Sequence, residues 1–308
     1  MTTKAVIDIG TNTFHLLIAE VDAEKNIGVV YKDTIAVKLG EGGVNKGYIA
    51  EEAYDRGINA LLRFKEALDR HHVEHVKTTA TAAVRGATNG QQFIAEVKAK
   101  TGIVIELIDG LQEATYIYEA VKGADLLSDE TALIMDIGGG SVEFIICNGE
   151  KIFWKNSYLL GAARLLADYY RQESAIEEST ITAMENHFAN TLIDFDEKIK
   201  LYQPKCLIGT AGSYDSYASI IALRNSTTFQ PDTTKSYPFA FEEFTALLNE
   251  LIASSHQDRV DMEGLIPLRT DMILMASILT EYVLEITGIQ KVLTCTYSLK
   301  EGLLLSAE

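Results

Sequence analysis

The chain has 308 residues, of which 47% are hydrophobic and 23% charged, and its formal net charge is −17. This composition is typical of a globular protein with a large core, and the length favours two domains. The acidic balance argues against nucleic-acid binding through a basic surface, because such binding requires many Lys and Arg contacts to phosphates. An anionic substrate would instead have to be bound by local cations, backbone N–H groups or a metal ion.

The cysteines and the N-terminal segment bear on the compartment. Cys147, Cys206 and Cys295 lie in separate apolar runs and show neither metal-site nor disulfide spacing, which favours a reducing environment. A strand is expected from about Ala5, no signal-peptide pattern precedes it, and no apolar run is long enough to span a bilayer. We therefore expect a cytoplasmic protein that has neither a membrane nor a nucleic acid as its partner.

Apolar runs and helical periodicity alternate along the chain, which predicts an α/β fold. Strands are expected at residues 4–9, 14–21, 27–38, 73–79, 102–108, 132–137, 142–147, 151–157, 205–208 and 291–295. Helices are expected at residues 50–70, 89–100, 109–123, 159–170, 175–200, 214 onward, 241–253 and 267–286. Residues 225–239 read as irregular and polar. The charges of the 175–200 helix, such as Glu177, Glu178 and Asp194, are expected to form a solvated face.

A glycine-containing turn between two apolar runs occurs twice. Residues 5–20 read AVIDIGTNTFHLLIAE, and residues 132–147 read ALIMDIGGGSVEFIIC. With an offset of 128, Asp8 aligns with Asp136, Gly10 with Gly138 and Thr13 with Ser141. The repeat suggests two related halves, and a turn of this kind can bind phosphate through its N–H groups. For either copy alone, an ordinary hairpin turn with a solvated Asp remains the alternative.

Three further segments are candidates for chemistry. Arg85 follows a strand in the segment TAAVRGATN, where it can contact a phosphate or form a surface salt bridge. Asp109 and Gln112 fit a capping box, whereas Glu113 shares the apolar face of its helix and is a candidate general base. Favourable placement at the positive end of the helix dipole is the alternative for Glu113.

Two glycine-rich segments lie outside the repeat. The segment KCLIGTAGS places glycines between a strand and a helix N-terminus, where an anion is favoured. The segment LGEGGVNKG, residues 39–47, is either a loop that closes over a ligand or a plain turn.

These motifs occur in the order found in a known family. The segments DIGTNTFHLLIAE, TAAVRGATN, DGLQEA, DIGGGSVEF, IGTAGS, GLIPLRTD and SLKEGLL resemble those of the exopolyphosphatase/guanosine pentaphosphate phosphohydrolase (Ppx/GppA) family. The resemblance implies two ribonuclease-H-like domains, as in actin, sugar kinases and chaperone ATPases, with a cleft between them. The expected domains are residues 1–124 and 125–308, with the last helix able to pack back on the first domain.

The resemblance also implies roles for particular residues. Glu113 corresponds to the proposed catalytic base, Arg85 to a phosphate-contacting residue, and Asp136 and Glu143 to acidic residues linked to a divalent metal, Mg²⁺ or Mn²⁺. Glu143 is also linked to water activation. The expected phosphate-binding residues are Asp8, Gly10, Thr11, Asn12, Thr13, Gly138, Gly139, Gly140, Ser141, Gly209, Ala211, Gly212 and Ser213.

The chain departs from the family pattern in three ways. Gln112 stands where the family has Glu, and Lys300 stands where it usually has Arg, which replaces a planar fork by a point charge. We also expect a short form without the helical C-terminal domain of longer members, which puts processive binding of long polyphosphate in doubt.

The expected reaction is release of terminal orthophosphate from polyphosphate or guanosine pentaphosphate, without a preference between them. A kinase or ATPase of the same superfamily and a non-catalytic sensor of polyphosphate or alarmones are the alternatives, because both would use the same phosphate turns. A homodimer is expected, since symmetric pairs are the commonest assemblies.

Overall fold

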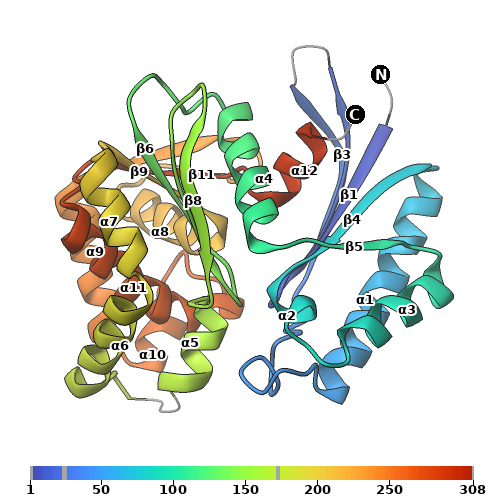
Figure 1. Cartoon of the computed structure of the whole chain (residues 1–308), viewed down its shortest axis with the longest axis horizontal. Coiled ribbons are helices and arrows are strands. Elements are labelled where there is room, and N and C mark those ends of the chain that lie inside the picture. The colour runs from blue at the N-terminus through green and yellow to red at the C-terminus, as the bar shows by residue number, and fades with distance from the viewer. Residues whose placement is uncertain (1–2, 23–25, 171–173, 307–308) are drawn as a thin grey trace. The chain divides into compact units, whose positions relative to one another are not determined.

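The computed structural model describes residues 3–22, 26–170 and 174–306. The chain divides into two compact units, each with one mixed sheet and helices packed on it (Figure 1). Unit 1 comprises Met1–Gly123 together with Ser298–Glu308, and unit 2 comprises Ala124–Tyr297. The C-terminal segment therefore belongs to the unit that contains the N-terminus.

The sheet of unit 1 has the strand order β3-β2-β1-β4-β5. Its strands are β1 (Thr3–Ile9), β2 (Phe14–Val21), β3 (Ile27–Ile35), β4 (His75–Ala80) and β5 (Ile105–Leu107). The first three form an antiparallel meander, whereas β4 and β5 continue the sheet beyond β1 in parallel. The loops that follow β1 and β4 therefore leave from the same edge of the sheet.

Helices cover both faces of this sheet. They are α1 (Glu51–Arg70), α2 (Ala82–Arg85), α3 (Gly90–Thr101), α4 (Gly110–Gly123) and α12 (Leu299–Leu305). Helices α1 and α3 lie together on one side, and their Phe64 and Phe93 are buried with Ile7 and Ile9 of β1. Helix α12 packs against α4, β1 and β2 on the other side (Figure 1).

The sheet of unit 2 repeats this connectivity. Its strands are β6 (Ala132–Ile137), β7 (Val142–Cys147), β8 (Ile152–Tyr158), β9 (Cys206–Thr210), β10 (Ser236–Phe239) and β11 (Val292–Cys295). The order β8-β7-β6-β9-β11 matches β3-β2-β1-β4-β5 in both direction and succession, and β10 is added at one edge. The sequence repeat thus corresponds to a repeat of topology.

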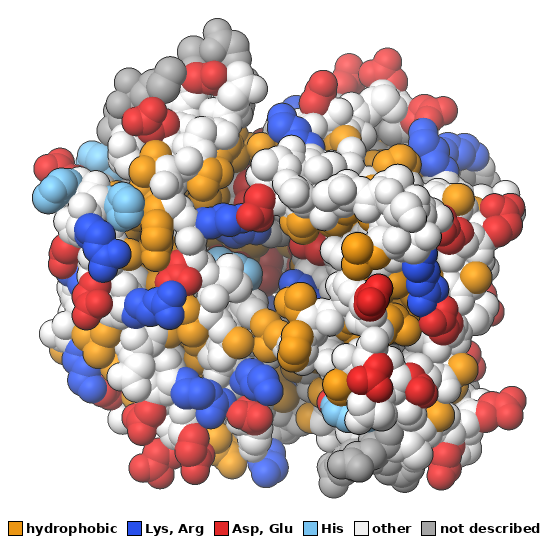
Figure 2. All heavy atoms as spheres, turned by 180° about the vertical axis from the view of Figure 1, so that it is seen from behind, with side chains coloured by type: hydrophobic (Ala, Val, Ile, Leu, Met, Phe, Trp, Pro, Cys, Tyr) orange, Lys and Arg blue, Asp and Glu red, His pale blue; other side chains and the backbone are white. Residues whose placement is uncertain are grey.

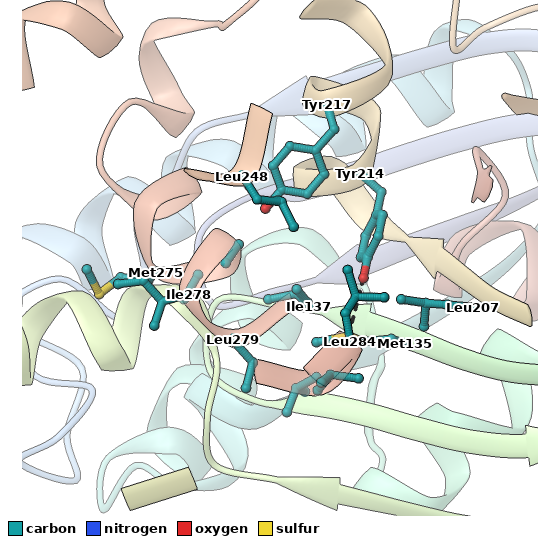
Figure 3. Close-up of a cluster of buried hydrophobic side chains, with 14 of the residues drawn as sticks. Met135, Ile137, Leu207, Tyr214, Tyr217, Leu248, Met275, Ile278, Leu279 and Leu284 are labelled. Carbon is teal, nitrogen blue, oxygen red and sulfur yellow. Dashed lines mark hydrogen bonds between the residues drawn. The ribbon is translucent and has the colours of Figure 1, made fainter. Parts of the chain in front are cut away.

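Helices pack around the sheet of unit 2, and one of them, α8, is hydrogen-bonded to the central strand β6. The helices are α5 (Ala162–Tyr169), α6 (Glu178–Thr191), α7 (Ile193–Tyr202), α8 (Ala211–Arg224), α9 (Phe241–Ala253), α10 (His256–Val260) and α11 (Met272–Thr287). Tyr214 at the start of α8 donates a hydrogen bond to Met135 Sδ at 3.2 Å (Figure 3). Burial raises the pKa of Tyr214, so its hydroxyl remains a donor. This contact holds the start of α8 beside the end of β6.

The expected long helix over residues 175–200 was wrong. The chain breaks at Leu192, which ends α6 and precedes α7. Because Leu192 is itself buried, the break lets Phe188 and Phe195 enter the same core. Asp194 does not belong to a purely solvated face, since it accepts hydrogen bonds from Tyr158 Oη at 2.7 Å and Asn156 Nδ2 at 3.0 Å.

Other boundaries also differ from the expectation. Residues 236–239 form edge strand β10, where Pro238 is tolerated because only one side is paired. The ring of Tyr237 packs edge-on against Phe229, and the ring of Phe239 stacks on Phe244. These aromatic contacts stabilise a strand that the polar residues around it made hard to predict. The predicted helix at 267–286 is divided into a 3-10 turn, Pro267–Arg269, and α11.

The surface has no single dominant basic region on the face drawn in Figure 2, where Lys and Arg lie interspersed with Asp and Glu. Among the helices that the structure describes, none is both long and apolar enough to cross a membrane.

The close approach of α12 to α4 makes a stability prediction. A Cβ at Gly302 would lie 1.8 Å from the carbonyl oxygen of Tyr116. Gly→Ala inside a helix normally stabilises by about 1 kcal/mol, but here we expect Gly302→Ala to destabilise by about 1–3 kcal/mol through overpacking. Urea unfolding measures the change. Gly28→Ala is the control, since its Cβ would meet only Glu20 O at 3.7 Å. A Gly302→Ala protein as stable as wild type would contradict this packing.

Candidate active site

The first candidate phosphate turn joins β1 to β2 in unit 1. Asp8 lies at the end of β1, and the N–H of Gly10 donates to the carbonyl of Thr13 at 3.1 Å. A Cβ at Gly10 would approach that carbonyl oxygen to 2.8 Å, so the closure requires glycine. The predicted residues Asp8, Gly10, Thr11, Asn12 and Thr13 are therefore brought together by local structure.

The glycine-rich loop at residues 39–47 is attached to this turn. The N–H of Gly40 donates to Thr11 O at 2.9 Å, and the N–H of Lys38 donates to Asn12 O at 2.7 Å. At its far end, Asn89 uses its side-chain amide to bind both the N–H and the carbonyl of Ile49. Backbone hydrogen bonds thus tie the loop and the residue before it to the first turn.

Arg85 and Glu113 come together although 28 residues separate them. Arg85 ends the short helix α2, and its Nη1 donates to Ile108 O at 2.8 Å and lies 3.5 Å from Glu113 Oε2. Glu113 is 8% exposed, as expected for a residue on the apolar face of α4. The structure therefore places a cation beside the candidate base in a partly buried ion pair, so the salt bridge that was the alternative for Arg85 is present, although it is not fully exposed.

The capping box at the start of α4 is confirmed. The N–H of Gln112 donates to Asp109 Oδ1 at 2.8 Å, and the N–H of Asp109 donates to Gln112 Oε1 at 3.2 Å. An amide oxygen accepts this hydrogen bond as well as a carboxylate would. The Gln112 departure therefore keeps the helix start that positions Glu113.

The second candidate turn joins β6 to β7 in unit 2. The N–H of Gly138 donates to Ser141 O at 3.0 Å, which repeats the closure seen in unit 1. The carbonyls of the turn accept hydrogen bonds from the start of α5: Ala162 N to Gly138 O, and Ala163 N to Gly139 O, both at 2.9 Å. Because a trans peptide directs its N–H opposite its C=O, the N–H groups that follow point away from α5. This arrangement favours anion binding.

Two acidic residues lie opposite each other on the two strands that flank this turn. Asp136 of β6 pairs with Glu143 of β7, and both are buried. Thr210 Oγ1 donates to Asp136 Oδ2 at 2.5 Å, and Ser157 Oγ donates to Glu143 Oε1 at 2.6 Å. Residues opposite each other in register share a face of the sheet. The two carboxylates are thus held side by side by hydroxyl donors.

These carboxylates fit the donor set of a magnesium site. In the described ranges, no group of three or more His, Cys, Asp or Glu side chains could hold a metal ion. Mg²⁺ does not require such a group, because it typically binds one or two carboxylates and completes its shell with water and substrate phosphates. Asp136 and Glu143 provide that number of hard oxygen ligands on one face.

The third candidate turn lies at the start of α8 and differs from its prediction. Gly209 is a residue of β9, and α8 begins at Ala211 rather than at Tyr214. A Cβ at Gly209 would fall 2.0 Å from the Tyr214 ring, so glycine here permits close packing. Ala211 has a φ of 64°, a conformation that costs a non-glycine residue about 1–2 kcal/mol. Strain of this kind is concentrated at functional sites.

Arg269 lies beside the third turn and was not among the predicted site residues. Its guanidinium lies over Gly212, where a Cβ would be only 1.3 Å from Nη1. Desolvation lowers the pKa of Arg269, and the nearby charge of Asp215 opposes this shift. The segment GLIPLRTD contains Arg269, but only the tertiary structure shows that it reaches the anion-favouring start of α8 with Gly212 and Ser213.

The remaining departure, Lys300, lies at the start of α12. Its Nζ is 3.2 Å from both Ser298 Oγ and Glu301 Oε2, within a capping box formed by Ser298 and Glu301. Lys300 therefore lies in the first turn of α12, a packed helix of unit 1.

The predicted residues thus form two groups. The first turn, Arg85 and Glu113 belong to unit 1, and the other two turns belong to unit 2 with Asp136 and Glu143. The hydroxyls of Thr210 and Ser157 belong to the second group and were not predicted. A Thr or Ser at a strand end is too common for sequence alone to single out.

Comparison with known proteins gives a consistent result. A model of the Ppx/GppA phosphatase family matches residues 17–308. An exopolyphosphatase from Cytophaga hutchinsonii is 38% identical, with a TM-score of 0.94 over 98% of this chain and 96% of that chain. The Ppx/GppA enzyme of Aquifex aeolicus, 23% identical, shares the fold with a TM-score of 0.81 over 99% of both chains.

A longer relative shows similarity over part of its length. The bifunctional 3-dehydroquinate synthase/phosphatase of Fusobacterium nucleatum is 30% identical over 295 residues, which are 92% of this chain and 43% of that protein. The chain thus spans less than half of this relative.

A family match over nearly the whole sequence agrees with the repeated fold and with the order of the turns along it. The chain belongs to the Ppx/GppA phosphatase family.

Proposed function

We propose that this protein hydrolyses terminal phosphoanhydride bonds and releases orthophosphate from inorganic polyphosphate or guanosine pentaphosphate. The family supports the reaction class, and the similarity to the Cytophaga exopolyphosphatase favours polyphosphate. The observation that carries the proposal is the buried Glu113 carboxylate beside Arg85. A base and a phosphate-binding cation at one point are what water attack on a phosphate requires.

Arg85 would bind a phosphate oxygen of the substrate. In the described part of the chain, its two side-chain hydrogen bonds both use Nη1. The guanidinium carries five N–H donors, so Nε and Nη2 can donate to an anion in a planar, bidentate manner. Its contact to Ile108 O at 2.8 Å fixes the group while the long 3.5 Å contact to Glu113 can yield. Arg85 would thereby hold the phosphate close to Glu113.

Glu113 would accept the proton of the attacking water. Catalytic hydrogen bonds are often long before substrate binds, and the 3.5 Å separation from Arg85 agrees with this. The capping box of Asp109 and Gln112 fixes the helix turn from which Glu113 projects. Phosphoryl transfer depends mainly on positioning and charge stabilisation, so N–H groups of the glycine turns would help to stabilise the charge on the leaving oxygen.

Asp136 and Glu143 would hold a divalent cation, Mg²⁺ or Mn²⁺. When bound, such an ion neutralises charge on the phosphates and on the leaving oxygen. The hydroxyls of Thr210 and Ser157 keep the two carboxylates oriented, as second partners of metal ligands commonly do. The donor set and its burial support this assignment.

The deciding experiment measures phosphate release from medium-chain polyphosphate, guanosine pentaphosphate and ATP in parallel. Release from either of the first two would support the proposal and identify the substrate. Release from ATP alone would instead favour a kinase or ATPase. Tight binding of polyphosphate or the alarmone without release from any of the three would favour a sensor.

The base role predicts a large effect of Glu113→Gln. We expect kcat to fall by about 10²–10⁴, the contribution of one general base, with little change in KM. Steady-state phosphate release on the preferred substrate measures both constants. Glu119→Gln makes the same exchange elsewhere on α4 and should leave kcat unaltered. An unchanged kcat in Glu113→Gln would remove this residue from the mechanism.

The metal assignment predicts loss of activity with EDTA and recovery with excess Mg²⁺ or Mn²⁺. Asp136→Asn removes one anionic ligand and should raise the Mg²⁺ concentration required for half-maximal activity by at least about tenfold, the scale seen when metal-site groups are altered. Titration of activity with Mg²⁺ measures this shift. The exposed Glu178→Gln is the matched control and should follow the wild-type curve. Full activity after exhaustive EDTA dialysis would refute the assignment.

A further inference from the structure

Each sheet carries a row of polar residues that crosses four strands at the level of the repeated turn. In unit 1 the register aligns Thr79 of β4, Asp8 of β1, His15 of β2 and Thr34 of β3. In unit 2 it aligns Thr210 of β9, Asp136 of β6, Glu143 of β7 and Ser157 of β8. The two rows therefore correspond position by position.

His15 is the point at which the two rows differ in chemistry. Glu143 in unit 2 is an acceptor, and Ser157 donates to it at 2.6 Å. His15 occupies the equivalent position in unit 1 but brings an imidazole, whose Nδ1 lies 3.0 Å from Thr34 Oγ1. Its Nε2 lies 2.9 Å from Thr13 Oγ1 in the first turn. An imidazole can donate through one nitrogen and accept through the other, which a carboxylate cannot do.

The contact with Thr13 has a consequence for the hydroxyl proton. A threonine hydroxyl has one proton, so it cannot donate both to His15 and to a phosphate. If Nε2 carries the ring proton and donates to Thr13 Oγ1, the Thr13 proton is directed away from His15. A neutral ring in this tautomer has Nδ1 as an acceptor, and the Thr34 hydroxyl lies where it can donate to it.

We propose that His15 is a positioning residue that donates from Nε2 to Thr13 Oγ1 and so leaves the Thr13 hydroxyl proton for substrate phosphate, with the Thr34 hydroxyl donating to Nδ1. The inference rests on the proposed function, which assigns Thr13 to the phosphate turn. The two rows would then have different roles. The carboxylates of unit 2 suit a cation, and the imidazole of unit 1 orients the Thr13 hydroxyl toward an anion.

Two substitutions of His15 distinguish its contact with Thr13 from its contact with Thr34. The amide nitrogen of His15→Gln can reach the place of Nε2 and keep the donor to Thr13. His15→Asn places its amide near Nδ1 and keeps only the contact to Thr34. We expect His15→Asn to raise KM for polyphosphate about 3- to 10-fold with kcat changed less than about twofold, the effect of one hydrogen bond. His15→Gln should stay within about twofold of wild type.

A double-mutant cycle tests whether His15 acts through Thr13. Thr13→Val removes the hydroxyl, so adding His15→Asn to it should raise KM no further. Equal effects of the Gln and Asn variants, or additive effects in the cycle, would overturn the proposal. Thermal unfolding of each variant separates these outcomes from loss of the fold. Thr34→Val, at an exposed position of β3, provides a second variant, for which we expect KM to rise about two- to threefold.

A measurement without turnover keeps this inference separate from the proposed function. Imidazole ¹⁵N resonances of the wild-type protein, with His15 assigned from the spectrum of His15→Gln, report which nitrogen is protonated. Under alkaline conditions in which the ring is neutral, we expect the proton on Nε2. A proton on Nδ1 would overturn the proposal. If no phosphate were released from any substrate, the proposed function would fail, while the tautomer and the calorimetric Kd of tripolyphosphate for wild type and variants would still decide the role of His15.

Discussion

The constraint on which both units depend is one backbone hydrogen bond, from a glycine N–H to the carbonyl of the third residue after it. It closes the turn at Gly10–Thr13 in unit 1 and at Gly138–Ser141 in unit 2. The bond reverses the chain in four residues, so an Asp at the end of one strand lies opposite the second residue of the next strand. The same bond therefore shapes the anion-favouring turn and sets the register of the polar row beneath it.

The buried charges around these turns are stable because each has a partner. Removing a carboxylate from water costs several kcal/mol unless hydrogen bonds or an opposite charge offset the loss. Thr210 and Ser157 donate to Asp136 and Glu143, and Arg85 lies beside Glu113. These partners lie on strands and helices that are packed in the core. One example of this packing is the hydrogen bond from Tyr214 of α8 to Met135 of β6. The groups are thus oriented before any ligand binds, which lowers the cost of binding it.

Local patterns predicted much of this architecture. Glu113 was recognised because a carboxylate at helical spacing from Ile117 and Ala120 must lie on a buried face, and the structure buries it. Gln112 was recognised because capping depends on residues three positions apart. Prediction was wrong where tertiary contacts overrode local preference. The helix over 175–200 breaks at Leu192, and Gly209 belongs to β9, where it pairs with both neighbouring strands.

The sequence by itself determined the two halves, their shared turn and the residue types of the candidate site, because strand, turn and capping preferences act over a few neighbouring residues. Only the tertiary structure decided which distant side chains complete that site. Thr210 reaches Asp136 across 74 residues, Arg85 reaches Glu113 across 28, and Arg269 reaches Gly212 from a separate turn. No local preference specifies such pairs, since they arise from the order of strands in a sheet and from helices packed on it by non-directional hydrophobic burial.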